Sequence, residues 1–382
     1  MNGSTDLAQR VAQLSERLSD GLKPLAEVAY DYRWSWLPGA EAVFREISPF
    51  RWERAGKNPV QFLNDLWPAT QAQAERNPEL MAQVARLADA VAEDRRRPDR
   101  PRPGIDGPVA FLCAEFGFHS SMPLYSGGLG VLAGDIVKEA SDQALPMVGV
   151  GLFYQRGYFR QRLDLNGWQQ EYWLVTEAHH LPLARVRDPD GEQLRLSVSV
   201  FGAELFFRVC RVDVGRVPVY LLDTKLGVNN PVQRWTTGRL YDASRAIRLA
   251  QYGVLGMGGV RLLRALGIEP AVIHLNEGHP ALAALELAAE DVAGGASLDD
   301  ALAAGRSRVV FTTHTPVAAG NETYSPDELA AAYGDLAARL GLDLDAFLGL
   351  MRIDPADAGE HPGMTPLALR MSRRRRGQPP PR

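Results

Sequence analysis

The sequence predicts an α/β fold in which a parallel sheet is covered on both faces by helices. Three observations predict it. From residue 109 onward, runs that are apolar throughout alternate with helical stretches, whereas the first hundred residues carry only a helical period. Between about 180 and 223, segments of alternating polarity indicate antiparallel strands. We therefore expect an α-helical extension, a parallel α/β unit and a small antiparallel β insert within that unit.

The bulk composition limits the class of protein. The 382 residues are 46% hydrophobic and 23% charged, which allows a large packed core and two or three domains. The net charge of −4 argues against a nucleic-acid or membrane-surface binder. Two cysteines, Cys113 and Cys210, cannot form a disulfide framework. No apolar run reaches the ~18 residues of a membrane span, and no signal peptide is recognisable. We expect a cytoplasmic protein with no nucleic-acid or membrane partner.

Residues 1–94 are expected to form the helical extension. Ser4, Thr5 and Asp6 supply an N-cap, and the apolar positions that follow have helical spacing: Leu7, Val11, Leu14 and Leu18. Residues 78–93 repeat this period. The tryptophans near residues 34 and 52 suit either sugar-stacking platforms or anchors buried between helices, and buried anchors are the commoner use.

A stretch rich in Arg, Pro and Gly at 95–108 is predicted to be a linker. The α/β unit is expected over 109–372. Its elements are strands at 109–113, 147–151, 271–275 and 308–313, helices at 131–143, 241–266 and 281–290, and antiparallel strands at 194–200, 204–212 and 217–222. Residues 164–167 (DLNG) signal a hairpin inside 154–173. The mixture of aromatic, amide and charged residues there suits a carbohydrate surface or a hairpin packed on the core, and composition does not separate the two.

The first motif with chemical meaning is the glycine turn Ser126-Gly127-Gly128-Leu129-Gly130, between a strand and a helix. Backbone N–H groups at such a turn bind anions, and the helix N-terminus favours negative charge. The turn is neither a Walker A loop nor a G-x-G-x-x-G motif. A tight strand–helix turn that binds nothing is an equal alternative.

Two more polar clusters follow apolar strands. The first is residues 274–280 (HLNEGHP) and the second is residues 312–316 (TTHTP). A zinc site in the first cluster is disfavoured, because its histidines are five apart and Gly278 and Pro280 break a helix. For the first cluster, the remaining interpretations are polar contacts to a substrate and a structural turn. The histidine of the second cluster could be a core residue whose hydrogen bonds are satisfied within the protein. Because open α/β sheets bind ligands at the carboxyl ends of their strands, we expect the three clusters to line one crevice.

The order of these motifs resembles that of the glycogen, starch and maltodextrin phosphorylases, most of all the bacterial α-glucan phosphorylases. The resemblance is carried by residues 114–168 (beginning AEFGFHSSMPLYSGGLG), by IHLNEGHPALAALE and by VVFTTHTPVAAGNE. The helical first hundred residues resemble the N-terminal extension of the bacterial subgroup. This family implies the Rossmann-like N-terminal domain of a GT-B glycosyltransferase, phosphorolysis of α-1,4-glucan to glucose 1-phosphate, and a homodimer.

The resemblance also implies roles for individual residues. Gly127, Gly128 and Leu129 would lie at the phosphate and glucose site, with Glu115 as an acid nearby. Glu277 stands where the family commonly has an acid, and His279 matches an active-site histidine. His314 matches the histidine whose backbone carbonyl contacts the sugar at the cleaved bond. No metal is implied.

The family cofactor is pyridoxal phosphate, whose lysine lies in a second domain beyond this chain. The four lysines of the sequence are Lys23, Lys57, Lys138 and Lys225, and none stands in surroundings that suit a Schiff base. Residues 373–382 (RRRRGQPPPR) are expected to be a disordered or out-of-frame tail, and a basic tail that binds nucleic acid is the disfavoured alternative. We therefore expect a chain truncated before its cofactor domain and inactive alone.

Two other functions remain at this point. One is a glucan-binding fragment without catalysis. The other is a nucleotide-sugar-dependent glucan synthase, which shares a Gly-Gly-Leu-Gly turn but commonly carries a lysine before it, where this sequence has Tyr125-Ser126.

Overall fold

The computed structural model describes residues 4–316 and 321–376. Its centre is a nine-stranded sheet with the order β11-β10-β9-β1-β2-β8-β7-β5, and β6 pairs with β7. All pairs from β11 to β8 are parallel. The α/β class predicted from the sequence is confirmed. The strands are β1 (Val109–Cys113), β2 (Met147–Leu152), β3 (Arg160–Leu163), β4 (Gln169–Tyr172), β5 (Ala184–Arg185), β6 (Arg195–Val200), β7 (Ala203–Val214), β8 (Val217–Asp223), β9 (Val272–Asn276), β10 (Val309–Thr312) and β11 (Arg374–Arg376).

The antiparallel strands differ from the expected insert. They do not form a small sheet of their own, because β8 pairs in parallel with β2 and in antiparallel with β7, so that β5, β6 and β7 extend the main sheet. Every residue of β8 is buried, which lets this strand occupy an interior place in the sheet. Alternating polarity predicts the strands but does not determine which neighbour each strand pairs with.

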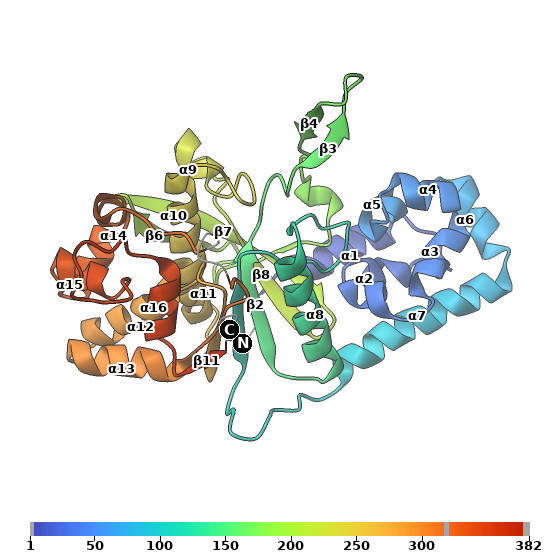
Figure 1. The fold of residues 1–382 in the computed structure, drawn as a ribbon. Helices are drawn as coiled ribbons and strands as arrows, with labels where there is room; N and C mark the ends of the chain where they lie inside the picture. The colour runs from blue at the N-terminus through green and yellow to red at the C-terminus, as the bar shows by residue number, and fades with distance from the viewer. Residues whose placement is uncertain (1–3, 317–320, 377–382) are drawn as a thin grey trace.

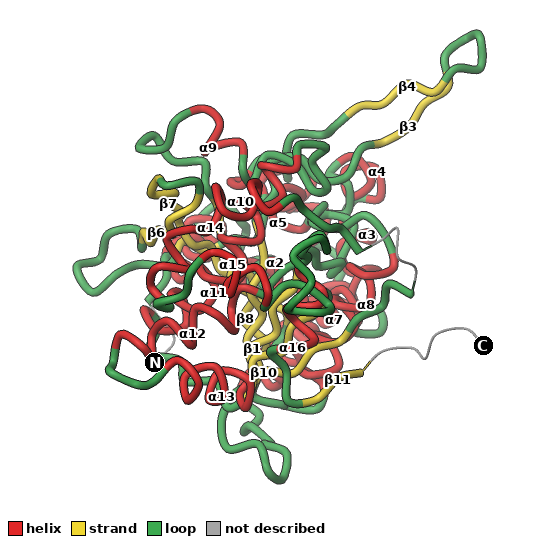
Figure 2. The backbone as a smooth tube through the Cα atoms, turned by 60° about the vertical axis from the view of Figure 1, so that its left-hand side comes forward, coloured by secondary structure: helices red, strands yellow, loops and turns green. Residues whose placement is uncertain are grey.

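Helices cover both faces of the sheet, as expected. Figure 1 shows α8 and the helical extension on one side and the helices from α10 onward on the other, and Figure 2 gives a second view. The helices are α1 (Leu7–Ser15), α2 (Leu25–Ala29), α3 (Ala40–Ile47), α4 (Pro49–Arg54), α5 (Pro59–Asn64), α6 (Pro68–Glu75), α7 (Pro78–Arg96), α8 (Gly128–Asp142), α9 (Pro231–Trp235), α10 (Arg245–Gly253), α11 (Gly259–Ala265), α12 (Leu282–Ala293), α13 (Leu298–Arg308), α14 (Pro326–Arg339), α15 (Leu344–Gly349) and α16 (Met364–Arg370), with short 3₁₀ turns at Tyr32–Trp36 and Ala178–His180.

The helical extension is built around buried aromatic rings. Trp34 and Trp52 are fully buried, and the rings of Phe44 and Trp52 stack with centroids 5.0 Å apart. The tryptophans at these two positions are therefore anchors between helices, as predicted. Asp6 precedes α1, but its carboxylate does not cap that helix, since it accepts a hydrogen bond from the backbone N–H of Arg185.

The extension packs against the sheet through buried polar contacts. Asp31 has no solvent exposure, and its carboxylate accepts hydrogen bonds from the backbone N–H groups of Arg33 at 2.8 Å and Gly215 at 2.7 Å. It also pairs with Arg95 at 2.8 Å. The buried apolar residues of the extension and the sheet form one continuous cluster. The division of the chain at 95–108 stays a prediction.

Two boundaries differ from the sequence expectation. Helix α7 continues to Arg96, two residues into the predicted linker, and is capped at its start by Asn77. Residues Arg374–Arg376, in the expected tail, form β11 and pair in parallel with β10. Residues 377–382 of that tail lie outside the described residues. No helix in the described parts of the chain is long and apolar enough to cross a bilayer.

The hairpin predicted at 154–173 is present as β3 and β4, joined by the turn at Asp164–Gly167. Figure 1 shows it projecting away from the body. Leu163, Leu165 and Trp168 are exposed, so the hairpin is not packed on the core.

The helix expected at 241–266 begins only at Arg245 and contains a π-helical segment at Val254–Gly258. Glycine is required inside it, because a Cβ at Gly256 would lie 2.9 Å from the backbone nitrogen of Ala283 at the start of α12. Residues 241–244 are left outside the helix and form a loop at the carboxyl edge of the sheet.

Candidate functional site

The carboxyl ends of three neighbouring strands bring the polar clusters together. In the parallel register, Cys113 of β1 is opposite Asn276 of β9, which in turn is opposite Thr312 of β10. Glu115, Glu277 and His314 therefore follow adjacent strands at one edge. The chain order also reverses here, because β2 lies on one side of β1 and β9 on the other. Such a switch point is where open α/β sheets bind ligands.

Glu277 organises the loop after β10. Its backbone has a positive φ of 67°, which is unusual for a residue other than glycine. Its carboxylate accepts hydrogen bonds from the backbone N–H of His314 and from the hydroxyls of Thr313 and Thr315, the latter two at 3.2 Å. Strained backbone that the surroundings hold in place is common at functional sites.

The imidazole of His314 is held against the sheet. Its Nε2 lies 2.9 Å from Oδ1 of Asn276, and the amide of Asn276 in turn donates to the buried thiol of Cys113 at 3.2 Å. No described residue donates a hydrogen bond to the His314 carbonyl. The side chain of His314 is thus hydrogen-bonded within the protein.

Glu115 is buried at 2% exposure directly after β1. Its carboxylate accepts a hydrogen bond from the backbone N–H of Ser126 at 2.8 Å and another from the hydroxyl of Tyr241. Tyr241 has a positive φ of 55° and lies 126 residues away in the sequence. This contact connects the glycine turn to the loop before α10.

The glycines after Ser126 have two different uses. Gly127 and Gly128 are exposed, and a Cβ at either position would meet no atom within 4 Å. In contrast, a Cβ at Gly134 would lie 2.6 Å from the carbonyl carbon of Gly117, so the close approach of α8 to that loop requires glycine. Gly127 and Gly128 thus present backbone N–H groups at the start of α8, whereas Gly134 is needed for the packing of the helix.

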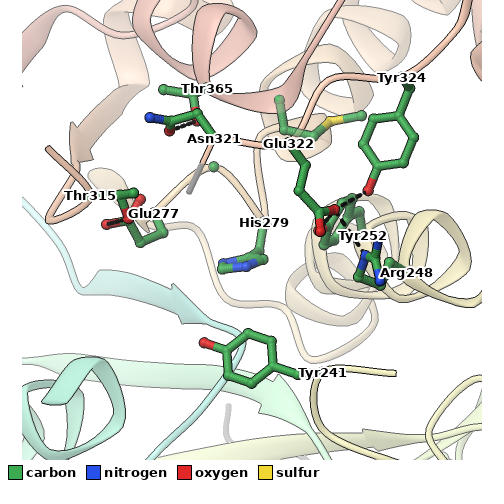
Figure 3. A pocket seen from close by; sticks show the side chains of 12 residues that line it. Tyr241, Arg248, Tyr252, Glu277, His279, Thr315, Asn321, Glu322, Tyr324 and Thr365 are labelled. Carbon is green, nitrogen blue, oxygen red and sulfur yellow. Dashed lines mark hydrogen bonds and ion pairs between the residues drawn. The ribbon is translucent and has the colours of Figure 1, made fainter. Parts of the chain in front are cut away.

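A pocket opens at this edge of the sheet, shown in Figure 3. Glu277, His279 and Tyr241 line it together with residues from α10, α16 and the loops before α12, after β10 and before α14. These other lining residues are Arg248, Tyr252, Gly278, Thr315, Asn321, Glu322, Tyr324, Met364 and Thr365.

His279 is the central side chain of the pocket, with the ring of Tyr252 at 5.4 Å and that of Tyr241 at 6.5 Å. Its Nδ1 is shielded from solvent and has no hydrogen-bond partner among the described residues. Burial lowers the pKa of His279, and the carboxylates of Glu277, Glu115 and Glu322 oppose this only in part. The imidazole is therefore neutral at pH 7.

Part of the pocket lining is a hydrogen-bonded group around Glu322 that the sequence analysis did not single out. Oε2 of Glu322 lies 2.6 Å from the hydroxyl of Tyr324, 3.4 Å from that of Tyr252 and 2.9 Å from Nε of Arg248. One signal was available, since Arg248 and Tyr252 are four residues apart on one helix face. Glu322 ends the block VVFTTHTPVAAGNE that carries the family resemblance, but the sequence analysis assigned it no role.

The predicted site residues are brought together only in part. Glu277 and His279 line the pocket, and Glu115 reaches it through Tyr241. Gly127, Gly128 and Leu129 lie at the start of α8, outside the pocket lining. His274 lies apart from His279, with its Nε2 2.9 Å from the hydroxyl of Thr312.

None of the four lysines lines the pocket. Lys23 pairs with Asp20, Lys57 with Glu41, and Lys225 is exposed. Lys138 lies over the ring of Trp36 at 5.6 Å on the flank of α8, where burial lowers its pKa. The residues of this chain therefore do not fit the attachment of pyridoxal phosphate as a Schiff base.

Comparison with known proteins gives relatives over almost the whole chain. The chain is 36% identical over 370 residues to a maltodextrin phosphorylase of Thermococcus litoralis, a match that covers 95% of this chain and 43% of the relative. The chain is a homologue of the phosphorylases. It is also 32% identical over 368 residues to a glycogen phosphorylase of Aquifex aeolicus, which covers 94% of this chain and 51% of that protein.

A glycogen phosphorylase of Mycobacterium tuberculosis is 36% identical over 390 residues, covering 96% of this chain and 44% of that relative. The phosphorylase homologue described here thus spans about half the length of these curated relatives. A family model described as a protein of unknown function (DUF3417) matches residues 18–122, from the helical extension through β1. The resemblance inferred from the sequence is confirmed.

Proposed function

We propose that this chain carries the glucan-binding side of an α-1,4-glucan phosphorylase, with the Rossmann-like architecture of a GT-B N-terminal domain. The reaction transfers a terminal glucosyl unit to inorganic phosphate and yields glucose 1-phosphate. The observation that carries the proposal is the convergence of Glu115, Glu277, His279 and His314 at one strand edge of a phosphorylase homologue. The homodimer and the cytoplasmic location stay predictions.

In this proposal His279 binds a sugar hydroxyl. Its imidazole is neutral, and its Nδ1, which has no hydrogen-bond partner among the described residues, accepts or donates one hydrogen bond without placing a charge in the pocket. The rings of Tyr241 and Tyr252 on either side supply apolar surface for the sugar.

His314 acts through its main chain and Glu277 through the loop that it positions. A carbonyl oxygen aimed at the anomeric carbon stabilises the positive charge of an oxocarbenium-like transition state. Since Glu277 holds the N–H of His314 and the hydroxyls of Thr313 and Thr315, it restrains the backbone on both sides of that carbonyl. Glu277 is thus a positioning residue in this arrangement.

The glycine turn contributes backbone donors. Gly127, Gly128 and Leu129 lie at the start of α8, where N–H groups without helical partners and the helix dipole attract a phosphate or sugar oxygen. Glu115 holds the turn through the N–H of Ser126. No step is assigned to pyridoxal phosphate, because no lysine of this chain reaches the pocket.

The test is calorimetric titration of the 382-residue chain with maltoheptaose, combined with an assay for glucose 1-phosphate in the presence of phosphate. Binding that His279→Asn weakens by about tenfold supports the pocket assignment, because one lost hydrogen bond to a sugar hydroxyl is worth about 1–1.5 kcal/mol. His361→Asn, at a histidine outside the pocket, is the matched control. Release of glucose 1-phosphate establishes catalysis by the chain itself.

Binding without turnover favours the glucan-binding fragment. Transfer from ADP-glucose in place of phosphorolysis indicates the synthase and contradicts the proposal, as does maltoheptaose binding that is equal in His279→Asn and the wild type.

A further inference from the structure

Two adjacent histidines lie in the segment that leads from the β3–β4 hairpin back to the sheet, and the proposed function gives them no role. His179 and His180 end a short 3₁₀ turn that Glu177 precedes. Nε2 of His179 and Nδ1 of His180 each lie 3.4 Å from Oε2 of Glu177. Among the described residues, this is the one set of three or more His, Cys, Asp or Glu side chains placed to hold a metal ion together. We call these three residues the His–Glu group.

The backbone of the His–Glu group is held by the helical extension and by the core. The N–H of His180 donates to the carbonyl of Glu177 at 3.0 Å, which closes the turn. The carbonyl of His180 accepts a hydrogen bond from Nδ2 of Asn58 at 2.7 Å, and Asn58 is the buried N-cap of α5. The next residue, Leu181, belongs to the hydrophobic core. Because the turn is fixed before any ligand binds, closing the three side chains around an ion costs only side-chain freedom.

The spacing of the ligand atoms matches the coordination sphere of a tetrahedral ion. Zn²⁺ binds imidazole nitrogen and carboxylate oxygen at about 2.0–2.2 Å, so two neighbouring ligand atoms of a tetrahedral site are about 3.3–3.5 Å apart. Both 3.4 Å distances to Oε2 of Glu177 agree with this. One ligand atom from each of the three residues lies within 4.8 Å of the other two. Since the side chain of His179 is exposed, a small rotation of its ring closes the remaining nitrogen–nitrogen edge.

No other polar group competes for these ligand atoms in the described parts of the chain. Over residues 4–316 and 321–376, the side chains of Glu177, His179 and His180 pair only with one another. The two imidazole rings lie against each other with centroids 3.9 Å apart, which keeps both beside the carboxylate. Glu177 and His179 are exposed and His180 is half-buried, so an ion can enter from solvent and keep one water molecule.

From the two matching distances and the fixed turn, we propose that Glu177, His179 and His180 bind one Zn²⁺ ion, with water as the fourth ligand. Two histidines and one glutamate with a water are a known zinc ligand set. Imidazole ligands favour Zn²⁺ over Mg²⁺ and Ca²⁺, which take oxygen ligands. The ion cross-links the turn that Asn58 holds against the helical extension. The inference does not rest on the proposed function, because none of the three residues lines the sugar pocket.

The test is calorimetric titration of the untagged 382-residue chain, freed of metal with EDTA, with Zn²⁺ and separately with Mg²⁺. The first variant is His179→Asn/His180→Asn, which removes both nitrogen ligands. The second is Glu177→Gln, which removes the charge of the third ligand and keeps its shape. The matched control, His361→Asn, replaces an exposed histidine that lies outside the group. Thermal unfolding in EDTA checks that the variants fold like the wild type.

We expect the wild type and His361→Asn to bind one Zn²⁺ ion per chain with equal affinity. Each of the two variants of the His–Glu group should bind it at least about tenfold more weakly, because even an outer-shell partner of a metal ligand is worth about 10–100-fold. Saturating Zn²⁺ should raise the Tm of the wild type by a few degrees, since the ion binds the folded turn, and EDTA should reverse the shift. Mg²⁺ should give neither binding nor a shift.

Three results would overturn the inference. They are the absence of saturable Zn²⁺ binding, an affinity that the variants of the His–Glu group leave unchanged, and an equal loss of affinity in His361→Asn. Binding of Mg²⁺ as tight as that of Zn²⁺ would also contradict it, because imidazole ligands should discriminate between the two ions. A failure of maltoheptaose to bind bears on the proposed function alone, since the zinc titration contains no glucan.

Discussion

Replacing Gly134 by alanine should displace α8 from the loop that carries Glu115. The added Cβ would lie 2.6 Å from the carbonyl carbon of Gly117 and closer still to its oxygen. Both atoms belong to the backbone, so no flexible side chain can move aside. Overpacking of this kind costs up to about 3 kcal/mol. Alanine regains about 1 kcal/mol of helix propensity, which leaves a net loss of up to about 2 kcal/mol in the free energy of unfolding.

The matched control is Gly128→Ala, the same chemical change on the same helix. A Cβ there meets no atom within 4 Å, so we expect the stability to change by less than about 0.5 kcal/mol. Thermal unfolding followed by circular dichroism measures both variants. Gly134→Ala should lower Tm by a few degrees while Gly128→Ala leaves it unchanged. An unchanged Tm in Gly134→Ala, or equal losses in the two variants, would refute the argument from close packing.

Further predictions concern buried groups. Burial raises the pKa of Asp31 to about 6, against the opposing charge of Arg95, so the folded protein binds a proton that the unfolded chain releases near pH 4. The stability contributed by protonated Asp31 is complete below about pH 4 and is lost as the pH rises through 6. In urea titrations between pH 4 and 6, the free energy of unfolding of Asp31→Asn should therefore vary less with pH than that of the wild type. Equal pH dependence in the two proteins would contradict this. Burial also raises the pKa of the Cys113 and Cys210 thiols to about 12. Neither should react with iodoacetamide at pH 8 in the native state, whereas both should react in urea, as mass spectrometry will show.

Much of the fold could be predicted because its signals are local. The apolar runs of β1, β9 and β10 and the period of α7 need only neighbouring residues to be recognised. The pairing of β8 with β2 could not be predicted, since alternation along a strand does not specify its partner. The π-helical segment at Val254–Gly258 also could not be predicted, and Gly256 within it packs against Ala283 of α12, which is distant in the sequence.

The candidate site divides in the same way. Glu277, His279 and His314 were found because they follow strands whose carboxyl ends must meet in a parallel sheet. Tyr241 and Glu322 were missed, because loops bring them to the site and their position depends on the path of the chain.

The sequence by itself determined the α/β class, the order of the motifs and the homology to phosphorylases, because these depend on local period and on residue identity. Only the tertiary structure decided which groups share one environment. It joined Tyr241 to Glu115 across 126 residues, and it left Nδ1 of His279 without a hydrogen-bond partner among the described residues. The physical reason is that burial, pairing and charge neutralisation depend on contacts between distant segments, which no local pattern records.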